Sequence, residues 1–228
     1  MTRGPVYVVT GTDTGVGKTV VTAALVVALR HLGVAPYVIK PAQTGLDQDP
    51  ADLDVVRSLA GDVPGHEGAR LRAPLAPDTA ARLEGAVLPS LAEQRDAVLA
   101  HAEDHTVLVE GAGGVMVRLG DIWNVLDLAD AVQHGGTPVE FVVVARAGLG
   151  TLNHSALTVD AITRRGFPVA GVVIGSWPDS PDLAMEQNLA DLPMMTGVPI
   201  LGRIPAGAGA LDPAAFQQAA PGWLILPD

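Results

Sequence analysis

The chain has 228 residues, of which 48% are hydrophobic and 17% charged, a balance that can build a buried core and excludes global disorder. Its 14 basic and 25 acidic residues give a net charge of −11, which would repel nucleic acid over most of the surface. The absence of cysteine excludes disulfides, thiolate zinc sites and cysteine nucleophiles. Because we find no signal-peptide or membrane-span pattern, we expect a cytoplasmic protein with no membrane or nucleic-acid partner.

Apolar runs typical of strands buried on both faces alternate with helical patterns along the chain. The strand-like runs cover residues 6–10, 37–39, 107–109, 141–145, 169–174 and 199–204. The helical patterns cover residues 18–32, 90–101, 125–134, 151–165 and 183–196. This alternation predicts an α/β fold in which a mostly parallel sheet lies between two layers of helices, a three-layer α/β/α arrangement.

Residues 41–89 form the least regular part of the sequence and contain six prolines. Because proline breaks helices and strand ladders, we interpret this segment as irregular and substrate-facing. Residues 211–228 are expected to form a packing helix and a tail. No repeat or linker divides the sequence, so we expect a single domain over residues 1–228.

A glycine-rich loop follows the first strand and leads directly into a helix. Its sequence, Gly11-Thr-Asp-Thr-Gly-Val-Gly-Lys-Thr19, can turn consecutive N–H groups toward phosphate oxygens. In such a loop Lys18 reaches the terminal phosphates, and the Thr19 hydroxyl binds Mg²⁺. Threonine stands at position 12, where the usual loop has its first glycine, so the loop is a variant. The motif predicts a nucleoside triphosphate site and a P-loop NTPase-like fold.

Two acidic segments are candidates for metal binding. Glu110 ends a strand-like run, at the edge where a parallel sheet faces its ligand, so it can complete a Mg²⁺ site with Thr19; alternatively it caps the next turn. The acidic run at residues 47–54 lacks the glycine of an EF-hand calcium loop. Within this run Asp52 precedes a helical pattern, and both a helix N-cap and a metal ligand fit its position.

Two further segments offer groups for anionic ligands. Lys40 follows another strand-like run, where it could neutralise charge on a transferring phosphoryl group. Residues 149–154, Leu-Gly-Thr-Leu-Asn-His, open a helix whose N–H groups suit a carboxylate. Taken alone, a lysine in such a place is more commonly an ordinary surface lysine, and the second segment would pass as a capping turn.

Four motifs, in this order, resemble those of the dethiobiotin synthetase family: residues 11–19, Lys40-Pro-Ala-Gln-Thr-Gly45, Val109-Glu-Gly-Ala-Gly-Gly114 and Leu149-Gly-Thr-Leu-Asn-His154. The resemblance implies a ligase of biotin biosynthesis that uses ATP and Mg²⁺. Its substrates would be 7,8-diaminononanoate and CO₂ or bicarbonate, joined through a carbamate and a carbamic-phosphoric anhydride. It also implies a homodimer, in which the 149–153 turn of one chain holds the substrate carboxylate at the neighbour's site.

The resemblance also assigns roles to individual residues. It makes Lys18, Lys40 and Thr14 catalytic, and it makes Thr19, Asp52 and Glu110 the metal ligands, with Asp49 and Asp54 as alternatives to Asp52. The substrate would contact Thr14, Lys40, Thr44, Gly111, Ala112, Gly113, Leu149, Gly150, Thr151 and Asn153. The nucleotide would contact Asp13, Thr14, Gly15, Val16, Gly17, Lys18, Thr19, Val20, Gly175, Ser176, Pro205, Ala206 and Gly207.

One segment departs from the family pattern. Many members carry an Asn-Asp pair that reads the adenine edge, where this chain has Gly175-Ser176-Trp177-Pro178. We therefore expect the base site to rely on main-chain groups, and to accept nucleoside triphosphates other than ATP.

Three other classes of protein are alternatives. A partition- or division-site ATPase would carry an extra lysine where this chain has Asp13. A small-molecule kinase would carry a basic lid, which the scattered basic residues do not form. A nucleotide-binding interaction module would bind nucleotide without diamine-dependent turnover.

Overall fold

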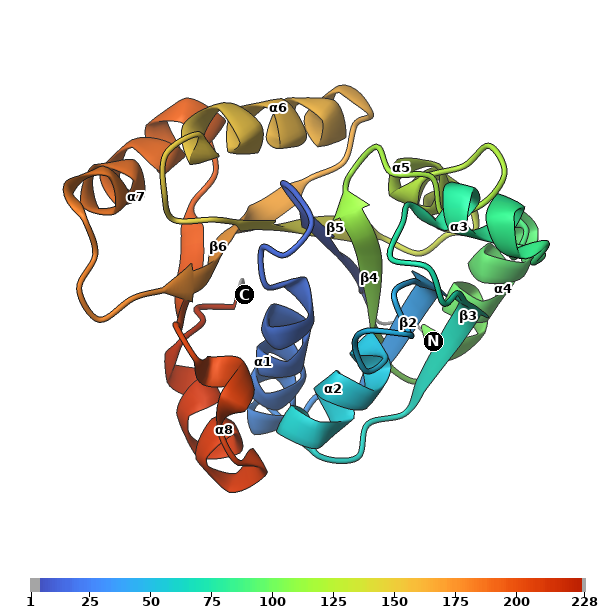
Figure 1. The fold of residues 1–228 in the computed structure, drawn as a ribbon, viewed down its shortest axis with the longest axis horizontal. Helices are drawn as coiled ribbons and strands as arrows, with labels where there is room; N and C mark the ends of the chain where they lie inside the picture. The colour runs from blue at the N-terminus through green and yellow to red at the C-terminus, as the bar shows by residue number, and fades with distance from the viewer. Residues whose placement is uncertain (1–4, 227–228) are drawn as a thin grey trace.

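The computed structural model describes residues 5–226, which build one seven-stranded sheet (Figure 1). Its strands are β1 (Val6–Gly11), β2 (Pro36–Gln43), β3 (Gly65–Arg70), β4 (Thr106–Gly114), β5 (Val139–Ala145), β6 (Val169–Trp177) and β7 (Ile200–Pro205). The helices are α1 (Lys18–His31), α2 (Asp52–Ala60), α3 (Pro77–Glu84), α4 (Leu91–His101), α5 (Val125–His134), α6 (Thr151–Arg164), α7 (Leu183–Thr196) and α8 (Pro213–Ala219). Neighbouring strands all pair in parallel, in the order β3-β2-β4-β1-β5-β6-β7. The predicted parallel α/β fold is confirmed.

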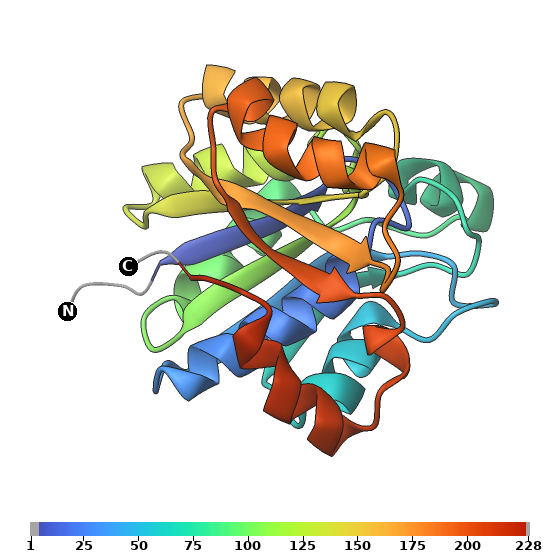
Figure 2. The same cartoon turned by 90° about the vertical axis from the view of Figure 1, so that its left-hand side faces the viewer.

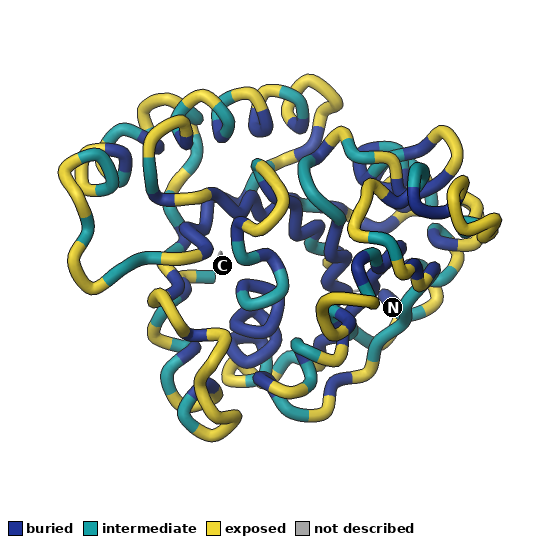
Figure 3. Tube along the Cα trace, viewed as in Figure 1, coloured by how far each residue is buried: buried dark blue, intermediate teal, exposed yellow. Residues whose placement is uncertain are grey.

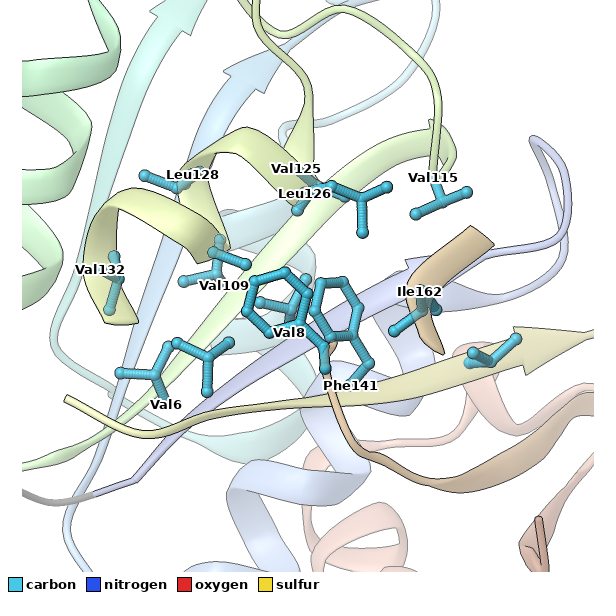
Figure 4. Close-up of a cluster of buried hydrophobic side chains, with 14 of the residues drawn as sticks. Val6, Val8, Val109, Val115, Val125, Leu126, Leu128, Val132, Phe141 and Ile162 are labelled. Carbon is cyan, nitrogen blue, oxygen red and sulfur yellow. The ribbon is translucent and has the colours of Figure 1, made fainter. Parts of the chain in front are cut away.

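Helices cover both faces of the sheet, as the alternation of patterns predicts (Figure 2). On one face, side chains from α4 to α7 pack against the central strands in a core that includes Val8, Phe141 and Ile162 (Figure 4). On the other face, α1, α2 and α8 enclose a second core that includes Val26 and Phe216. The burial map shows α1 covered along most of its length (Figure 3), which explains why its sequence is apolar nearly all round.

The strand order places a ligand crevice near the middle of the sheet. β1 lies between β4 and β5; the connection after β1 leads to β2 on one side, and the connection after β4 leads to β5 on the other. At such a switch point the loops beyond the carboxyl ends of neighbouring strands diverge and leave room for a ligand. The loop after β1 and the end of β4, which carries Glu110, both lie at this point.

The prediction that residues 41–89 are irregular is wrong in part, because α2, β3 and α3 lie within them. β3 is an edge strand with the sequence Gly-His-Glu-Gly-Ala-Arg, which lacks the apolar run of a buried strand. Pro77 begins α3, where a missing N–H costs no helical hydrogen bond. Pro41 lies in β2 beyond the last residue that pairs with β4. Prolines in this segment are therefore compatible with helices and strands, provided that they stand where no main-chain N–H is needed.

The packing helix expected near the C-terminus is confirmed as α8. After it, Leu224 forms an antiparallel bridge with Gly202, so the following segment covers the outer edge of β7. The last two residues of the expected tail lie outside the described residues. No helix within residues 5–226 is long and apolar enough to cross a membrane.

Candidate active site

The phosphate loop has the backbone geometry that its glycines predict. Gly15 and Gly17 adopt left-handed conformations with φ of 72° and 97°. A Cβ at Gly17 would lie 2.6 Å from the carbonyl oxygen of Gly175, at the end of β6. Glycine is therefore required at position 17 both by conformation and by space. The loop is held against β6 and leads directly into α1.

Lys18 lies in this loop with its Nζ donating to the main-chain oxygen of Asp13 at 3.0 Å. Its side chain lines a cavity but is largely buried. Burial and, second, the charge of the nearby Lys40 lower the pKa of the Lys18 ammonium from 10.5 to about 8. Nearby acids therefore do not fully balance the charge of the Lys18 ammonium, and a bound anion would stabilise it.

Lys40 is the centre of a buried charge cluster, with only 3% of its surface exposed. Its Nζ lies 2.5 Å from Asp52 Oδ2 and 3.0 Å from Glu110 Oε1, and it donates to the Gly111 carbonyl at 3.0 Å. Burial acts to lower the pKa of Lys40, but the charges of Glu110 and Asp52 outweigh it and raise the pKa. Burial likewise acts to raise the pKa of Asp52, and the Lys40 charge outweighs it and lowers the pKa. Lys40 and Asp52 are therefore held in their charged forms by each other.

Oxygen atoms from three elements converge beside Lys40. The Thr19 hydroxyl lies 2.9 Å from Asp52 Oδ1 and 3.0 Å from Glu110 Oε1. Hydroxyl and carboxylate oxygens are the donors that Mg²⁺ prefers, and Mg²⁺ usually needs only one or two protein carboxylates beside phosphate and water. Residues 5–226 contain no group of three or more acidic, histidine or cysteine side chains arranged to hold a metal. The donor set therefore fits Mg²⁺ bound together with a nucleotide.

The structure distinguishes the three aspartates that are candidates for the metal ligand beside Thr19. Asp52 is the first residue of α2; Ala51 occupies the N-cap and its side chain makes no capping bond, so Asp52 is not a helix cap. Gln43 Oε1 instead accepts the Asp52 N–H at 3.0 Å, which turns the start of α2 toward the phosphate loop. Asp49 lines the cavity from an exposed position, and Asp54 faces arginines on the surface. Of these acids, Asp52 is the one that contacts Thr19.

These groups line one cavity of about 500 Å³ above the carboxyl ends of β1, β2 and β4. The residues from the sequence prediction that line it are Thr14, Gly15, Gly17, Lys18, Thr19, Val20, Lys40, Thr44, Asp52, Glu110, Ala112 and Gly113. Gly111 contacts the cluster through its carbonyl, as described above. The cavity combines cations with oxygen ligands, so it can bind a polyanion and a divalent metal together.

The residues predicted to contact the nucleotide base lie beside the loop, outside this cavity. Trp177 pairs with Pro205, and the Ala206 N–H donates to the Trp177 carbonyl at 2.7 Å, which joins the ends of β6 and β7. Ser176 and residues 205–207 are exposed. A Cβ at Gly209 would lie 3.1 Å from Val20, so this turn sits against the first turn of α1.

The segment predicted to hold a carboxylate also lies outside its own chain's cavity. Gly150, with φ of 89°, precedes α6, and Leu149, Gly150 and Asn153 are exposed while Thr151 is buried. None of these residues lines the cavity.

Sequence reasoning missed three contacts that organise the site. Thr22 is fully buried and donates to Glu110 Oε2 at 2.7 Å. It lies one helical turn after Thr19, a spacing that offered a signal. Gln43 belongs to the Lys40 motif and orients α2, as noted above. Arg146 follows β5 directly and pairs with Asp13, but nothing in its local sequence indicates this partner.

A strand, a glycine loop with Lys18 and Thr19, and an acid at the end of the neighbouring strand together define a P-loop nucleotide-binding protein. A family model described as an AAA domain matches residues 6–212. The ParA family ATPase from Chlorobium tepidum shares the fold with a TM-score of 0.58 and 14% identity, over 96% of this chain and 93% of that one.

Closer relatives identify the family within this class. The chain is 51% identical over 221 residues to the ATP-dependent dethiobiotin synthetase BioD of Rhodococcus jostii, covering 96% of this chain and 94% of the relative. It is 52% identical over 221 residues to the protein of the same name from Streptomyces avermitilis, covering 96% and 91%. The chain therefore belongs to the dethiobiotin synthetase family, in agreement with the sequence motifs.

Proposed function

We propose that this protein is a ligase that makes dethiobiotin from 7,8-diaminononanoate and CO₂ at the expense of ATP, within biotin biosynthesis. The observation that carries the proposal is the convergence of Lys18, Lys40, Thr19, Asp52 and Glu110 on one cavity at the phosphate loop. The family membership supports the same reaction. A soluble substrate and ATP suit a cytoplasmic location, which we also propose.

The reaction needs placement and charge neutralisation more than activation of a nucleophile. One amine of the diamine adds to CO₂ and loses a proton, giving a carbamate. A carbamate oxygen attacks the γ-phosphorus, and the bond to the β–γ bridging oxygen breaks to release ADP. The second amine then attacks the carbonyl carbon of the mixed anhydride, loses a proton, and displaces phosphate to close the ring.

The residues of the cavity divide this work. We assign Lys18 to the terminal phosphates, because it reaches the cavity from the phosphate loop at the start of α1, and Lys40 to the carbamate, because it reaches the same cavity from β2. Thr14 and Thr44 line the same cavity and would hydrogen-bond the diamine or its carbamate. Thr19, Asp52 and Glu110 would hold Mg²⁺, which when bound neutralises phosphate charge and orients the terminal phosphate.

A reconstituted reaction tests the proposal. The purified protein is mixed with diaminononanoate, bicarbonate, Mg²⁺ and ATP, and ADP release is followed together with the product mass. We expect ADP release that depends on the diamine and a product of the mass of dethiobiotin. ADP release that is equally fast without the diamine would contradict a synthetase, and a phosphorylated diamine derivative as the final product would favour a kinase.

We also propose that the active form is a homodimer. Large apolar side chains are exposed to solvent around the start of α6: Met116 is 66% exposed, Leu157 61% and Leu149 82%. A shallow cavity of about 370 Å³ between the segment after β4 and α6 includes Leu157 in its lining. A second chain packed here would bring the carboxylate-binding turn to its neighbour's substrate.

Sedimentation tests the dimer. Leu157→Arg places a charge on the proposed interface and should convert a dimer to a monomer with loss of turnover. Leu183→Arg is the matched control, because Leu183 is also exposed, at 74%, but lies on α7. A wild-type protein that sediments as a monomer at concentrations giving full turnover would contradict the proposal.

Finally, we propose that the base site is permissive. Two segments are predicted to contact the base: Gly175–Ser176 and residues 205–207. They carry one short hydroxyl side chain and otherwise only main-chain and apolar groups, which supports a permissive site. Turnover is measured with ATP, CTP and GTP in competition. We expect KM values within about tenfold of each other, since a hydrogen bond to a main-chain group contributes only about 0.5–1.5 kcal/mol. A strict preference for ATP would contradict a permissive site.

A further inference from the structure

Arg146 and Asp13 form an ion pair at the rim of the phosphate loop. The Arg146 Nη2 lies 2.5 Å from Asp13 Oδ2, across 133 positions of sequence. Asp13 is tied down twice more, because its Oδ1 accepts the Thr14 N–H at 2.7 Å and its main-chain oxygen accepts from Lys18 at 3.0 Å. One acidic residue thus connects the end of β5, the phosphate loop and the loop lysine.

An aspartate in this position opposes the function of the loop. The residues that follow it, Thr14 and Gly15, line the cavity that would receive a triphosphate. Like charges a few ångströms apart repel strongly, because at physiological ionic strength salt screens charges effectively only when they are more than about 8 Å apart. An unpaired Asp13 would therefore raise the cost of binding a polyanion.

We propose that Arg146 is a positioning residue of the nucleotide site, which neutralises Asp13 and thereby keeps the loop receptive to a triphosphate. The proposal rests on nucleotide binding within the proposed function and on nothing in the later steps. Arg146 acts through Asp13: its side chain is partly exposed and does not line the cavity. The Asp13 side chain also fixes the backbone of the loop, because its Oδ1 accepts the Thr14 N–H.

A double-mutant cycle tests this. The variants are Arg146→Met, Asp13→Asn and the pair together; asparagine retains the Oδ1 acceptor for the Thr14 N–H. The dissociation constant of Mg²⁺–ATP is measured by calorimetry on the full chain without diamine. We expect Arg146→Met to weaken binding about fivefold or more, and Asp13→Asn to remove most of that effect in the double variant.

Arg164→Met is the matched control, because it also removes one arginine from a close ion pair, with Asp160 at 2.7 Å on the outside of α6. It should leave the dissociation constant unchanged. At saturating ATP, the kcat of Arg146→Met should match that of the wild type, so the loss appears in KM. The fivefold effect should also shrink in high salt.

Two results would overturn the proposal. If Arg146→Met binds ATP as tightly as the wild type, the arginine has no role at this site. If the loss is the same in the Asp13→Asn background, Arg146 acts directly on the nucleotide or through another group. Because binding is measured without diamine, both outcomes are separate from a failure of the synthetase reaction.

Discussion

Replacing Lys40 by methionine should destabilise the protein, because the lysine is the cation paired with the buried Glu110 and the partly buried Asp52. The change keeps most of the side-chain volume but leaves Asp52 and Glu110 facing each other with only Lys18 nearby. Removing one partner of a buried ion pair costs about 3–5 kcal/mol, and the partial exposure of Asp52 favours the lower end. We therefore expect the free energy of unfolding to fall by about 3 kcal/mol.

The assay is urea denaturation at neutral pH with EDTA present, so that no metal compensates the acids. Lys40→Met combined with Asp52→Asn should recover about half of the loss, because it leaves one basic and one acidic side chain, Lys18 and Glu110, in the cavity lining. Turnover should fall at least a hundredfold in both variants if Lys40 neutralises developing charge. An unfolding free energy unchanged in Lys40→Met would refute the view that these acids rely on Lys40.

Two further substitutions test the supports of the site. Thr22→Val removes the hydroxyl that donates to Glu110 Oε2 at 2.7 Å and should lower the unfolding free energy by about 2 kcal/mol, whereas Thr22→Ser should retain most of it; equal losses in urea denaturation would contradict this. Gly17→Ala places a Cβ 2.6 Å from the Gly175 oxygen and should weaken ATP binding at least tenfold by calorimetry. Gly33→Ala is its control, since Gly33 has a similar φ of 77°, a Cβ there meets nothing within 4 Å and it does not line the cavity, so a similar loss in both variants would count against the role of the close contact.

Much of the fold could be predicted because its buried strands are continuous apolar runs, as in β1 and β5, and its longer helices lie between them. β3 could not, since an edge strand with one face partly open needs few apolar residues, and its Gly65 is required by the approach of the Val38 carbonyl. α3 was missed because a proline stands at its first position. A proline predicts the end of one element without excluding the start of the next.

The site was predictable to the extent that its residues stand at strand ends or in the loop itself. Parallel strands bring their carboxyl ends to one edge, so Lys18, Lys40 and Glu110 could be expected to meet. The contact of Arg146 with Asp13 could not, because it depends on how far a long side chain extends from the end of β5 across to the loop. The local sequence therefore predicts where a strand ends, but it does not predict which residue a long, flexible side chain contacts.

Lys18 and Lys40 are the only two lysines in the sequence, and every other basic side chain apart from histidine is arginine. The two differ in chemistry, because burial lowers the pKa of Lys18 to about 8 while the surrounding acids raise that of Lys40. At pH 8 about half of Lys18 should be neutral and nucleophilic, against well under 1% of an ordinary lysine. Amine-reactive reagents should therefore label Lys18 selectively among the side chains.

Peptide mass spectrometry reads the two lysines separately and distinguishes both from the terminal amine, which also titrates near pH 8. In EDTA, labelling of Lys18 should rise steeply between pH 7 and 9 as the ammonium loses its proton, while Lys40 stays unmodified. ATP should protect Lys18, since the triphosphate stabilises the charged ammonium and fills the cavity. Lys18 labelling as slow at pH 8 as that of a free lysine side chain would contradict the lowered pKa. Labelling that ATP does not slow would show that this lysine is not the loop's phosphate-binding cation.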